Sequence, residues 1–361
     1  MSEFIRTYII AEAGVNHNGS LEMAMQLIDV ATDAGVDAVK FQTFKANNLV
    51  TRKAVKAEYQ LKSTDTNESQ YEMLKKLELD EDAHQILIEY CKSKGIEFLS
   101  TPFDNESVEL LSYKFNLPRL KVSSGDLTNA PLLLNMAQTQ KPIILSTGMS
   151  DLGEIEQALG VLAFGYINSM EDPSIEKFKN AYYSTEGYEM LKEKVVLLHC
   201  TTEYPSPIHE VNLRVMDTLN QAFGLVVGFS DHTLGIAIPI AAVARGAKVI
   251  EKHFTLDRRL PGPDHKASLE PNELELMVQS IRQVELSLGN GIKKPVVSEL
   301  KNIAIARKSI FAAKPISKGD KFSKDNLVIK RPGNGLSPIN YWGLLDKIAD
   351  ESYETDEQVK L

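Results

Sequence analysis

The chain has 361 residues, of which 43% are hydrophobic, and its 49 acidic and 40 basic side chains give a formal net charge of −9. This charge disfavours broad attraction to nucleic acid or acidic membranes, and no run of about 18 apolar residues predicts a membrane span. The apolar N-terminal stretch is interrupted by Glu12 and lacks a signal-peptide pattern. Cys91 and Cys200 both lie in apolar segments and are expected to be reduced. We therefore expect a cytoplasmic protein.

Short runs rich in β-branched residues alternate with longer segments of helical character, which is typical of a parallel α/β fold. Between the first two runs, apolar residues recur at helical spacing over Leu21–Ala34 and stop at Gly35. Eight β/α units within about 280 residues predict a closed (β/α)₈ TIM barrel. The predicted strands are Tyr8–Glu12, Ala38–Gln42, Glu97–Thr101, Leu120–Ser123, Ile143–Ser146, Val195–Cys200, Val226–Ser230 and Val249–His253.

The barrel is predicted to occupy residues 1–288 and to end with a helix near Pro271–Leu288. A linker rich in Gly, Pro and Lys is predicted over 289–303, and a small domain with short strands and turns over 304–361. A domain of this size is marginal alone, so we expect it to dock on another surface. Residues Asn168–Lys194 are longer and more charged than a crossover needs, and are expected to form a surface insertion.

Polar side chains gather at the ends of the predicted strands. In a (β/α)₈ barrel the C-terminal ends of all the strands face one opening, so these side chains are expected to form one site. His232 and His253 follow successive strands, and imidazole suits divalent ions such as Mn²⁺, Fe²⁺ or Zn²⁺. This pair predicts a metal site, and a structural or acid/base role for both histidines is the alternative.

Lys40 and Lys121 lie in apolar strands that point into the barrel mouth, where an unpaired ammonium is costly. Together with nearby hydroxyls they predict a cradle for the phosphate of a small substrate. No P-loop or dinucleotide-binding motif follows any strand. Structural ion pairs are the alternative for each lysine. Glu12 and Glu251 are candidates for proton handling or for accepting from sugar hydroxyls, and either could instead pair with a lysine.

At this point a family resemblance is visible, running from about Tyr8 to the end of the chain. The ordered segments resemble the sialic acid synthase family. They are IAEAGVNHNGS, VKFQTFKA, STPFD, KVSSGD, ILSTGM, LHCTTEYPSP, GFSDHTLG, EKHFTLD with PGPDH, and IKRPGNGLSP. The resemblance implies a (β/α)₈ barrel followed by a small antifreeze-like (SAF) domain that is exchanged between the subunits of a homodimer.

The implied reaction condenses phosphoenolpyruvate with N-acetylmannosamine and water to give N-acetylneuraminate and phosphate. The alternative is the same reaction on a 2,4-diacetamido-6-deoxy hexose, which gives legionaminic or pseudaminic acid. A non-enzymatic sugar-binding protein is the remote alternative.

The resemblance also implies roles for individual residues. His232 and His253 are the implied metal ligands, for Mn²⁺ with Mg²⁺ or Co²⁺ as alternatives, and Glu12 and Glu251 are the implied catalytic residues. Thr202 stands where some members have Asn, and it keeps a hydroxyl that can make the implied phosphate contact. The phosphoenolpyruvate site is expected to comprise Lys40, Thr101, Lys121, Ser124, Thr202 and Ser230, and the sugar site Gln42, Tyr204, Asp264 and, from the other subunit's small domain, Arg331.

Overall fold

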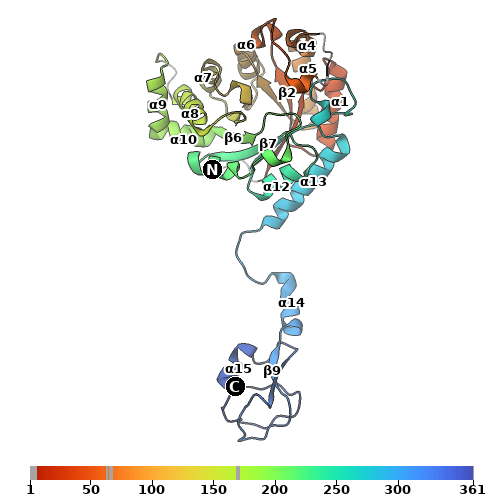
Figure 1. The fold of residues 1–361 in the computed structure, drawn as a ribbon, viewed down its shortest axis with the longest axis vertical. Coiled ribbons are helices and arrows are strands. Elements are labelled where there is room, and N and C mark those ends of the chain that lie inside the picture. The colour runs from red at the N-terminus through yellow and green to blue at the C-terminus, as the bar shows by residue number, and fades with distance from the viewer. Residues whose placement is uncertain (1–5, 62–63, 65–67, 168–170, 361) are drawn as a thin grey trace. The chain divides into compact units, whose positions relative to one another are not determined.

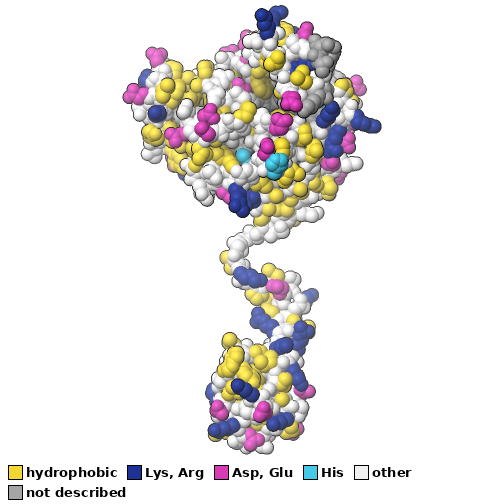
Figure 2. Space-filling model, viewed as in Figure 1, with side chains coloured by type: hydrophobic (Ala, Val, Ile, Leu, Met, Phe, Trp, Pro, Cys, Tyr) yellow, Lys and Arg dark blue, Asp and Glu magenta, His cyan; other side chains and the backbone are white. Residues whose placement is uncertain are grey.

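The computed structural model describes residues 6–61, 64, 68–167 and 171–360. The chain divides into two compact units, Met1–Gly289 and Asn290–Leu361 (Figure 1). Lys and Arg side chains are interspersed with Asp and Glu over the visible face of the first unit (Figure 2). Among the described residues, no helix is both long and apolar enough to cross a bilayer.

Eight parallel strands form the centre of the first unit, and their hydrogen-bonded order is β3-β2-β1-β8-β7-β6-β5-β4. In the described part of the chain no ladder joins β3 to β4, so the barrel is nearly closed with one seam. The predicted (β/α)₈ barrel is confirmed, and each predicted strand boundary is within two residues of the observed one. The strands are β1 (Tyr8–Gly14), β2 (Ala38–Thr43), β3 (Glu97–Pro102), β4 (Leu120–Val122), β5 (Ile143–Ser146), β6 (Val195–Cys200), β7 (Val226–Asp231) and β8 (Val249–His253).

Helices pack around these strands and bury the outer face of the barrel (Figure 1). The predicted helix after β1 begins at Ser20, whose hydroxyl accepts from the Met23 amide, and Gly35 follows it at φ +75°. The helices are α1 (Leu21–Asp33), α2 (Ala46–Leu49), α3 (Glu58–Leu61), α4 (Gln70–Leu77), α5 (Glu81–Lys94), α6 (Asn105–Glu109), α7 (Ala130–Gln138), α8 (Leu152–Ile167), α9 (Ile175–Tyr183), α10 (Thr185–Lys194), α11 (Val215–Phe223), α12 (Ala237–Ala244) and α13 (Pro271–Leu288). A π-helical turn over Leu110–Lys114 and 3₁₀ turns over Ser124–Asp126, Ile208–Glu210 and His265–Ala267 complete the unit.

The segment predicted as a surface insertion forms two helices, α9 and α10, which pack against α8. Phe178 of α9 meets Phe164 of α8 edge-on, with ring centroids 5.3 Å apart. Residues 168–170 of that prediction lie outside the described residues. The two helices extend the helical layer between β5 and β6.

The second unit contains α14 (Val297–Ala306), the antiparallel strands β9 (Ser309–Ala312) and β10 (Leu327–Lys330), a 3₁₀ turn (Pro338–Asn340) and α15 (Tyr341–Leu344). It has its own small core, which includes Ile310, Phe322 and Tyr353. Helix α14 overlaps the end of the predicted linker. It begins there because the Glu299 carboxylate accepts from the Val296 amide at 2.9 Å and satisfies a helix N-terminal donor.

Candidate active site

The inside of the barrel changes from apolar to polar along the strands. One apolar layer contains Ile10, Ala38, Leu99, Ile144, Leu198 and Val249. Alternate residues of a strand point to the same face, so the next inward residue on each strand lies two positions further on. Those residues are Glu12, Lys40, Thr101, Ser146, Cys200 and Glu251, and all of them line a cavity of about 390 Å³. The apolar layer therefore forms the floor of a polar pocket.

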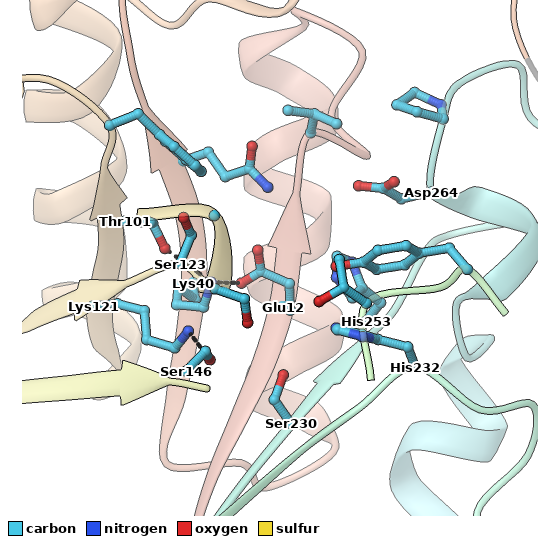
Figure 3. Close-up of a pocket in the computed structure, with 18 of the residues that line it drawn as sticks. Glu12, Lys40, Thr101, Lys121, Ser123, Ser146, Ser230, His232, His253 and Asp264 are labelled. Atoms are coloured by element: carbon cyan, nitrogen blue, oxygen red, sulfur yellow. Dashed lines mark hydrogen bonds and ion pairs between the residues drawn. The ribbon is translucent and has the colours of Figure 1, made fainter. Parts of the chain in front are cut away.

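The cavity brings together every barrel residue that the sequence analysis assigned to the site (Figure 3). Lys121, Ser146 and Ser230 lie at one end, Asp264 lies at the other, and Glu12 lies between Lys40 and the two histidines (Figure 3). The residues gathered there are Glu12, Lys40, Gln42, Thr101, Lys121, Ser124, Thr202, Tyr204, Ser230, His232, Glu251, His253 and Asp264.

Strand register sets the order of the charged groups. Glu12 on β1 stands beside Lys40 on β2 and beside His253 on β8. Lys40 Nζ is 2.5 Å from Glu12 Oε2 and donates to Thr101 Oγ1 at 3.1 Å. The Lys40 and Glu12 side chains are 4% and 2% exposed, so this pair is withdrawn from solvent. It belongs to the pocket and not to the protein surface.

A second lysine and glutamate line the same cavity. Lys121 Nζ donates to Ser146 Oγ at 2.6 Å and is 3.5 Å from Glu251 Oε1. Ser230 Oγ donates to the same Glu251 oxygen at 2.8 Å, while the other oxygen is 3.6 Å from Lys40 Nζ. Glu251 thus contacts both lysines, and the two lysines face one small space.

These contacts shift the pKa values of Glu12 and Glu251 in opposite directions. Burial raises the pKa of Glu12 above its usual value, and the attraction of Lys40 only partly opposes this effect. Burial acts in the same direction on Glu251, but Lys121 and Lys40 together hold the pKa of Glu251 below its usual value. When the pKa values of two neighbouring carboxyls shift in opposite directions, one carboxyl can hold a proton while the other stays ionised and stabilises positive charge.

His232 and His253 lie on the other side of Glu12, with ring centroids 5.6 Å apart. The Nδ1–H of His232 donates to the Thr201 carbonyl at 2.6 Å, because a carbonyl can only accept, and this leaves Nε2 with a lone pair. His253 Nδ1 is buried without a hydrogen-bond partner among the described residues. Burial lowers the pKa of both rings, so both are neutral near pH 7.

This donor set fits a divalent cation. Two neutral imidazoles with available lone pairs can ligate a metal, and oxygen atoms of water or substrate can complete the shell. Within the described ranges, no third His, Cys, Asp or Glu joins them in a cluster suited to a metal. Each histidine is therefore needed in any such site.

Tyr204 and Asp264 border the histidines. The Tyr204 ring packs 4.2 Å from the His232 ring and 5.6 Å from the His253 ring, centroid to centroid. Burial raises the pKa of Asp264 to about 6, and Lys40 acts in the opposite direction. Tyr204 therefore fixes the ring positions from one side, and Asp264 places a carboxyl at the mouth.

Two glycines leave room where the side chains converge. A Cβ on Gly148 would lie 2.4 Å from Thr202 Oγ1 and 2.9 Å from both Ser124 Oγ and Cys200 Sγ. Gly14 has φ +54°, and a Cβ there would lie 3.2 Å from Glu12 Oε1. Thr202 Oγ1 is buried without a partner in the described part of the chain, which leaves it available to a ligand.

Behind the histidines, Asp231 and Lys252 form an ion pair at 2.6 Å, with both side chains fully buried. Asp231 Oδ1 also accepts from the Thr233 amide at 2.9 Å. Asp231 precedes His232 and Lys252 precedes His253, so the pair joins β7 to β8 directly beside the two imidazoles. Sequence reasoning missed this pair because its partners are 21 residues apart.

Arg331 is the one predicted site residue outside the first unit. It follows β10, and its Nε donates to the Ala306 carbonyl at the end of α14, at 3.0 Å. Ser146 and Cys200 also line the cavity, although neither was predicted from the sequence as a site residue. Both lie two positions after an inward-facing apolar residue of the same strand, Ile144 or Leu198, and this spacing could have identified them.

Known proteins resemble the chain over nearly its whole length. The NeuB family model matches residues 27–293 and the SAF domain model matches residues 307–349. The chain is 53% identical to the N,N'-diacetyllegionaminic acid synthase of Campylobacter jejuni, over 98% of this chain and 99% of that protein. It is 47% identical to the protein of the same name from Legionella pneumophila, over 92% and 87% of the two chains.

A solved structure supports the same relationship. The N-acetylneuraminic acid synthetase of Leptospira borgpetersenii is 33% identical, with a TM-score of 0.65 over 82% of this chain and 90% of that one. The resemblance to the sialic acid synthase family is therefore confirmed, and the second unit contains the SAF domain that it implied. The chain belongs to the NeuB family of nonulosonate synthases.

Proposed function

We propose that this chain condenses phosphoenolpyruvate with a 2,4-diacetamido-6-deoxy hexose and water to give a legionaminic-type acid and phosphate. The observation that carries the proposal is one cavity with two lysines and several hydroxyls at one end and two neutral histidines at the other. The sequence analysis put N-acetylmannosamine first. The two relatives of higher identity are legionaminic acid synthases, and they favour the alternative sugar.

The lysine end is suited to phosphoenolpyruvate. Lys40 and Lys121 supply two buried cations, and charge-assisted hydrogen bonds to phosphate are strong where water is excluded. Ser124 and Thr202 add hydroxyls next to Gly148, where the absence of a side chain leaves room for them. The anion would replace Glu251 as the anionic partner of Lys121, and this attraction would offset part of the desolvation cost of the anion.

The histidine end is suited to the open-chain aldehyde of the sugar. His232 and His253 would hold a divalent cation, expected to be Mn²⁺, which when bound acts as a Lewis acid toward the aldehyde oxygen. Gln42 and Asp264 border this end and offer an amide and a carboxyl to sugar hydroxyls. Held in this way, C1 of the sugar would lie next to C3 of phosphoenolpyruvate, beside Glu12.

The two glutamates divide the remaining work. A carbon–carbon bond forms between C3 of phosphoenolpyruvate and C1 of the sugar, and the aldehyde oxygen takes up a proton. Glu12 lies between the lysine and histidine ends, and its raised pKa suits it to holding that proton. Positive charge then develops at C2, where the ionised Glu251 stabilises it. Water adds at C2 and gives one proton to Glu12, which is ionised after the aldehyde oxygen has taken its proton. Phosphate then leaves as its C2–O bond breaks, and the remaining C2 hydroxyl becomes the ketone and gives its proton to the departing phosphate.

A panel of sugars tests the proposal. With saturating phosphoenolpyruvate, kcat/KM should be at least about tenfold higher for the legionaminic-series diacetamido sugar than for N-acetylmannosamine or the pseudaminic-series isomer. Phosphate release and the product mass are the measurements. A higher kcat/KM for N-acetylmannosamine would indicate that the product is N-acetylneuraminate. If none of these sugars led to phosphate release, the result would argue against a synthase.

Replacing Lys121 tests the phosphate end. Lys121→Ala removes one charged donor, a loss of roughly 1.5–3 kcal/mol, and should raise KM for phosphoenolpyruvate about ten- to hundredfold. KM for the sugar should change much less. Lys121→Met keeps the bulk of the side chain and should behave like Lys121→Ala, whereas the exposed Lys192→Ala should match the parent. Equal rises in both KM values would contradict a dedicated phosphate role.

The SAF domain is proposed to act in a homodimer. Arg331 is held at the end of α14 in the second unit, and the resemblance gives it the acylamino end of the sugar. We propose that each Arg331 completes the site of the other subunit, so the active unit is a domain-swapped dimer.

A further inference from the structure

An apolar cluster covers one side of the cavity mouth. It consists of four buried residues and three half-buried ones, and every member except Phe44 lines the cavity. We call the cavity-lining members the apolar wall. They are Val15, Leu49, Met73, Leu74, Leu77 and Phe103.

The apolar wall is built into the fold. Helix α4, which carries three of its members, begins with a capping box in which Ser69 and Glu72 exchange hydrogen bonds. Beyond its other end, the Glu78 carboxylate accepts from the Ala46 amide of α2 at 2.6 Å. A Cβ on Gly19 would lie 2.4 Å from the Lys76 carbonyl, so the loop after β1 approaches α4 closely.

Behind the wall, Phe44 packs edge-on against Phe103, with ring centroids 6.2 Å apart. The wall is therefore tied to the segments that follow β1, β2 and β3. It stands as a preformed surface and does not need a ligand to assemble it.

The rest of the cavity is mostly polar. Lysines, glutamates, histidines and hydroxyls line it above the apolar layer, and they suffice for a phosphate, a carboxylate and a reacting aldehyde. An apolar surface in the same cavity gains free energy only by covering apolar atoms of a ligand. Phosphoenolpyruvate has only a small methylene group to offer, so the sugar must provide most of them.

The candidate sugars differ in this property. N-acetylmannosamine has one methyl group, on the acetamido group at C2, and has hydroxyls at C4 and C6. A 2,4-diacetamido-6-deoxy hexose has three methyl groups, two of them at the C4 to C6 end. That end is remote from the reacting C1, and the wall stands at the mouth, remote from the cavity floor.

We infer that the apolar wall binds the C4 acetamido and C6 methyl groups of the sugar and thereby determines the preference for a 6-deoxy diacetamido substrate. This inference rests on the proposed function and names the residues that set its sugar specificity. A hydroxyl at C6 placed against Met73 and Leu74 would be desolvated and would receive no hydrogen bond from those two side chains. A hydrophobic surface rejects an added hydroxyl only moderately, so a preference of about ten- to a hundredfold is expected.

A polar substitution in the wall tests the inference. Leu74 is half-buried, and Leu74→Gln keeps a good helix former in α4. The ratio of kcat/KM for the diacetamido sugar to kcat/KM for N-acetylmannosamine should fall about tenfold. KM for phosphoenolpyruvate should stay at the parent value. Leu49→Gln, at the half-buried end of α2, should shift the ratio in the same direction.

The matched control is Leu134→Gln, a half-buried leucine on α7 that does not line the cavity. It should leave the ratio unchanged even if it lowers stability. If both wall variants reduce kcat/KM for the two sugars by the same factor, or leave the ratio at the parent value, the wall does not select the sugar. That outcome differs from failure of the proposed function, in which the parent enzyme itself would not prefer the diacetamido sugar.

Discussion

Chelation of divalent ions should abolish turnover, and added Mn²⁺ should restore it. His232→Ala and His253→Ala should each lower kcat by roughly 1000-fold or more, because Lewis-acid polarisation of the aldehyde is worth several kcal/mol. The expected loss is this large because only two histidines form the candidate site, and among the described residues no third side chain of a suitable type joins them. Calorimetric titration with Mn²⁺ should show one site in the parent and sharply weaker binding in each variant.

His209→Ala is the matched control. The His209 side chain is 82% exposed and does not line the cavity, so this variant should keep the parent's kcat and Mn²⁺ affinity. Circular dichroism should show that the His232 and His253 variants keep the barrel fold. Full activity of the chelated parent, or unchanged Mn²⁺ binding in both variants, would contradict the metal assignment.

Mixing two inactive variants should restore activity if Arg331 acts across a dimer. His253→Ala lacks a metal ligand and Arg331→Ala lacks the sugar contact, so each is expected to be inactive alone. After subunit exchange, the Arg331→Ala barrel in a mixed dimer keeps its histidines and receives an intact Arg331 from its neighbour. Random exchange makes half the dimers mixed with one complete site each, so about a quarter of the sites should recover. Steady-state turnover of the mixture is the measurement.

Two controls accompany this experiment. Lys330→Ala removes the neighbouring exposed cation, which pairs with Asp356, and should stay active. Mass measurement must show that subunits have exchanged. If the exchanged mixture stays inactive, or if Arg331→Ala alone matches the parent, Arg331 does not complete the partner subunit's site.

The barrel and the position of its site were predictable because parallel strands leave a strong local pattern. Each strand is a short apolar run followed by polar residues, and a barrel gathers all such ends at one opening. Lys40 and Glu251 were therefore recognisable as cavity residues although 211 positions separate them. The ionic partners of those residues were not predictable, since they depend on strand register, which a run of apolar residues does not encode.

Features that join distant segments escaped the sequence analysis for the same reason. The Asp231–Lys252 pair looks in the sequence like two ordinary charges beside two histidines, and only the buried geometry distinguishes it. The apolar wall draws its members from two loops and two helices, so no single segment shows it. We propose that the choice between sugars depends on such surfaces, which the motifs that ranked N-acetylmannosamine first do not include.

The seam between β3 and β4 links substrate binding to the integrity of the barrel. Strand β4 is only three residues long and pairs with β5 alone, while β3 pairs with β2 alone. Thr101 on β3 and Lys121 on β4 stand on opposite sides of this seam, and both line the cavity. An anion bound by Thr101 and Lys121 together would connect β3 to β4, the only two strand edges of the described barrel that lack a ladder partner. Anion binding would then oppose local opening of the seam, and local opening would favour anion release, through one coupling free energy.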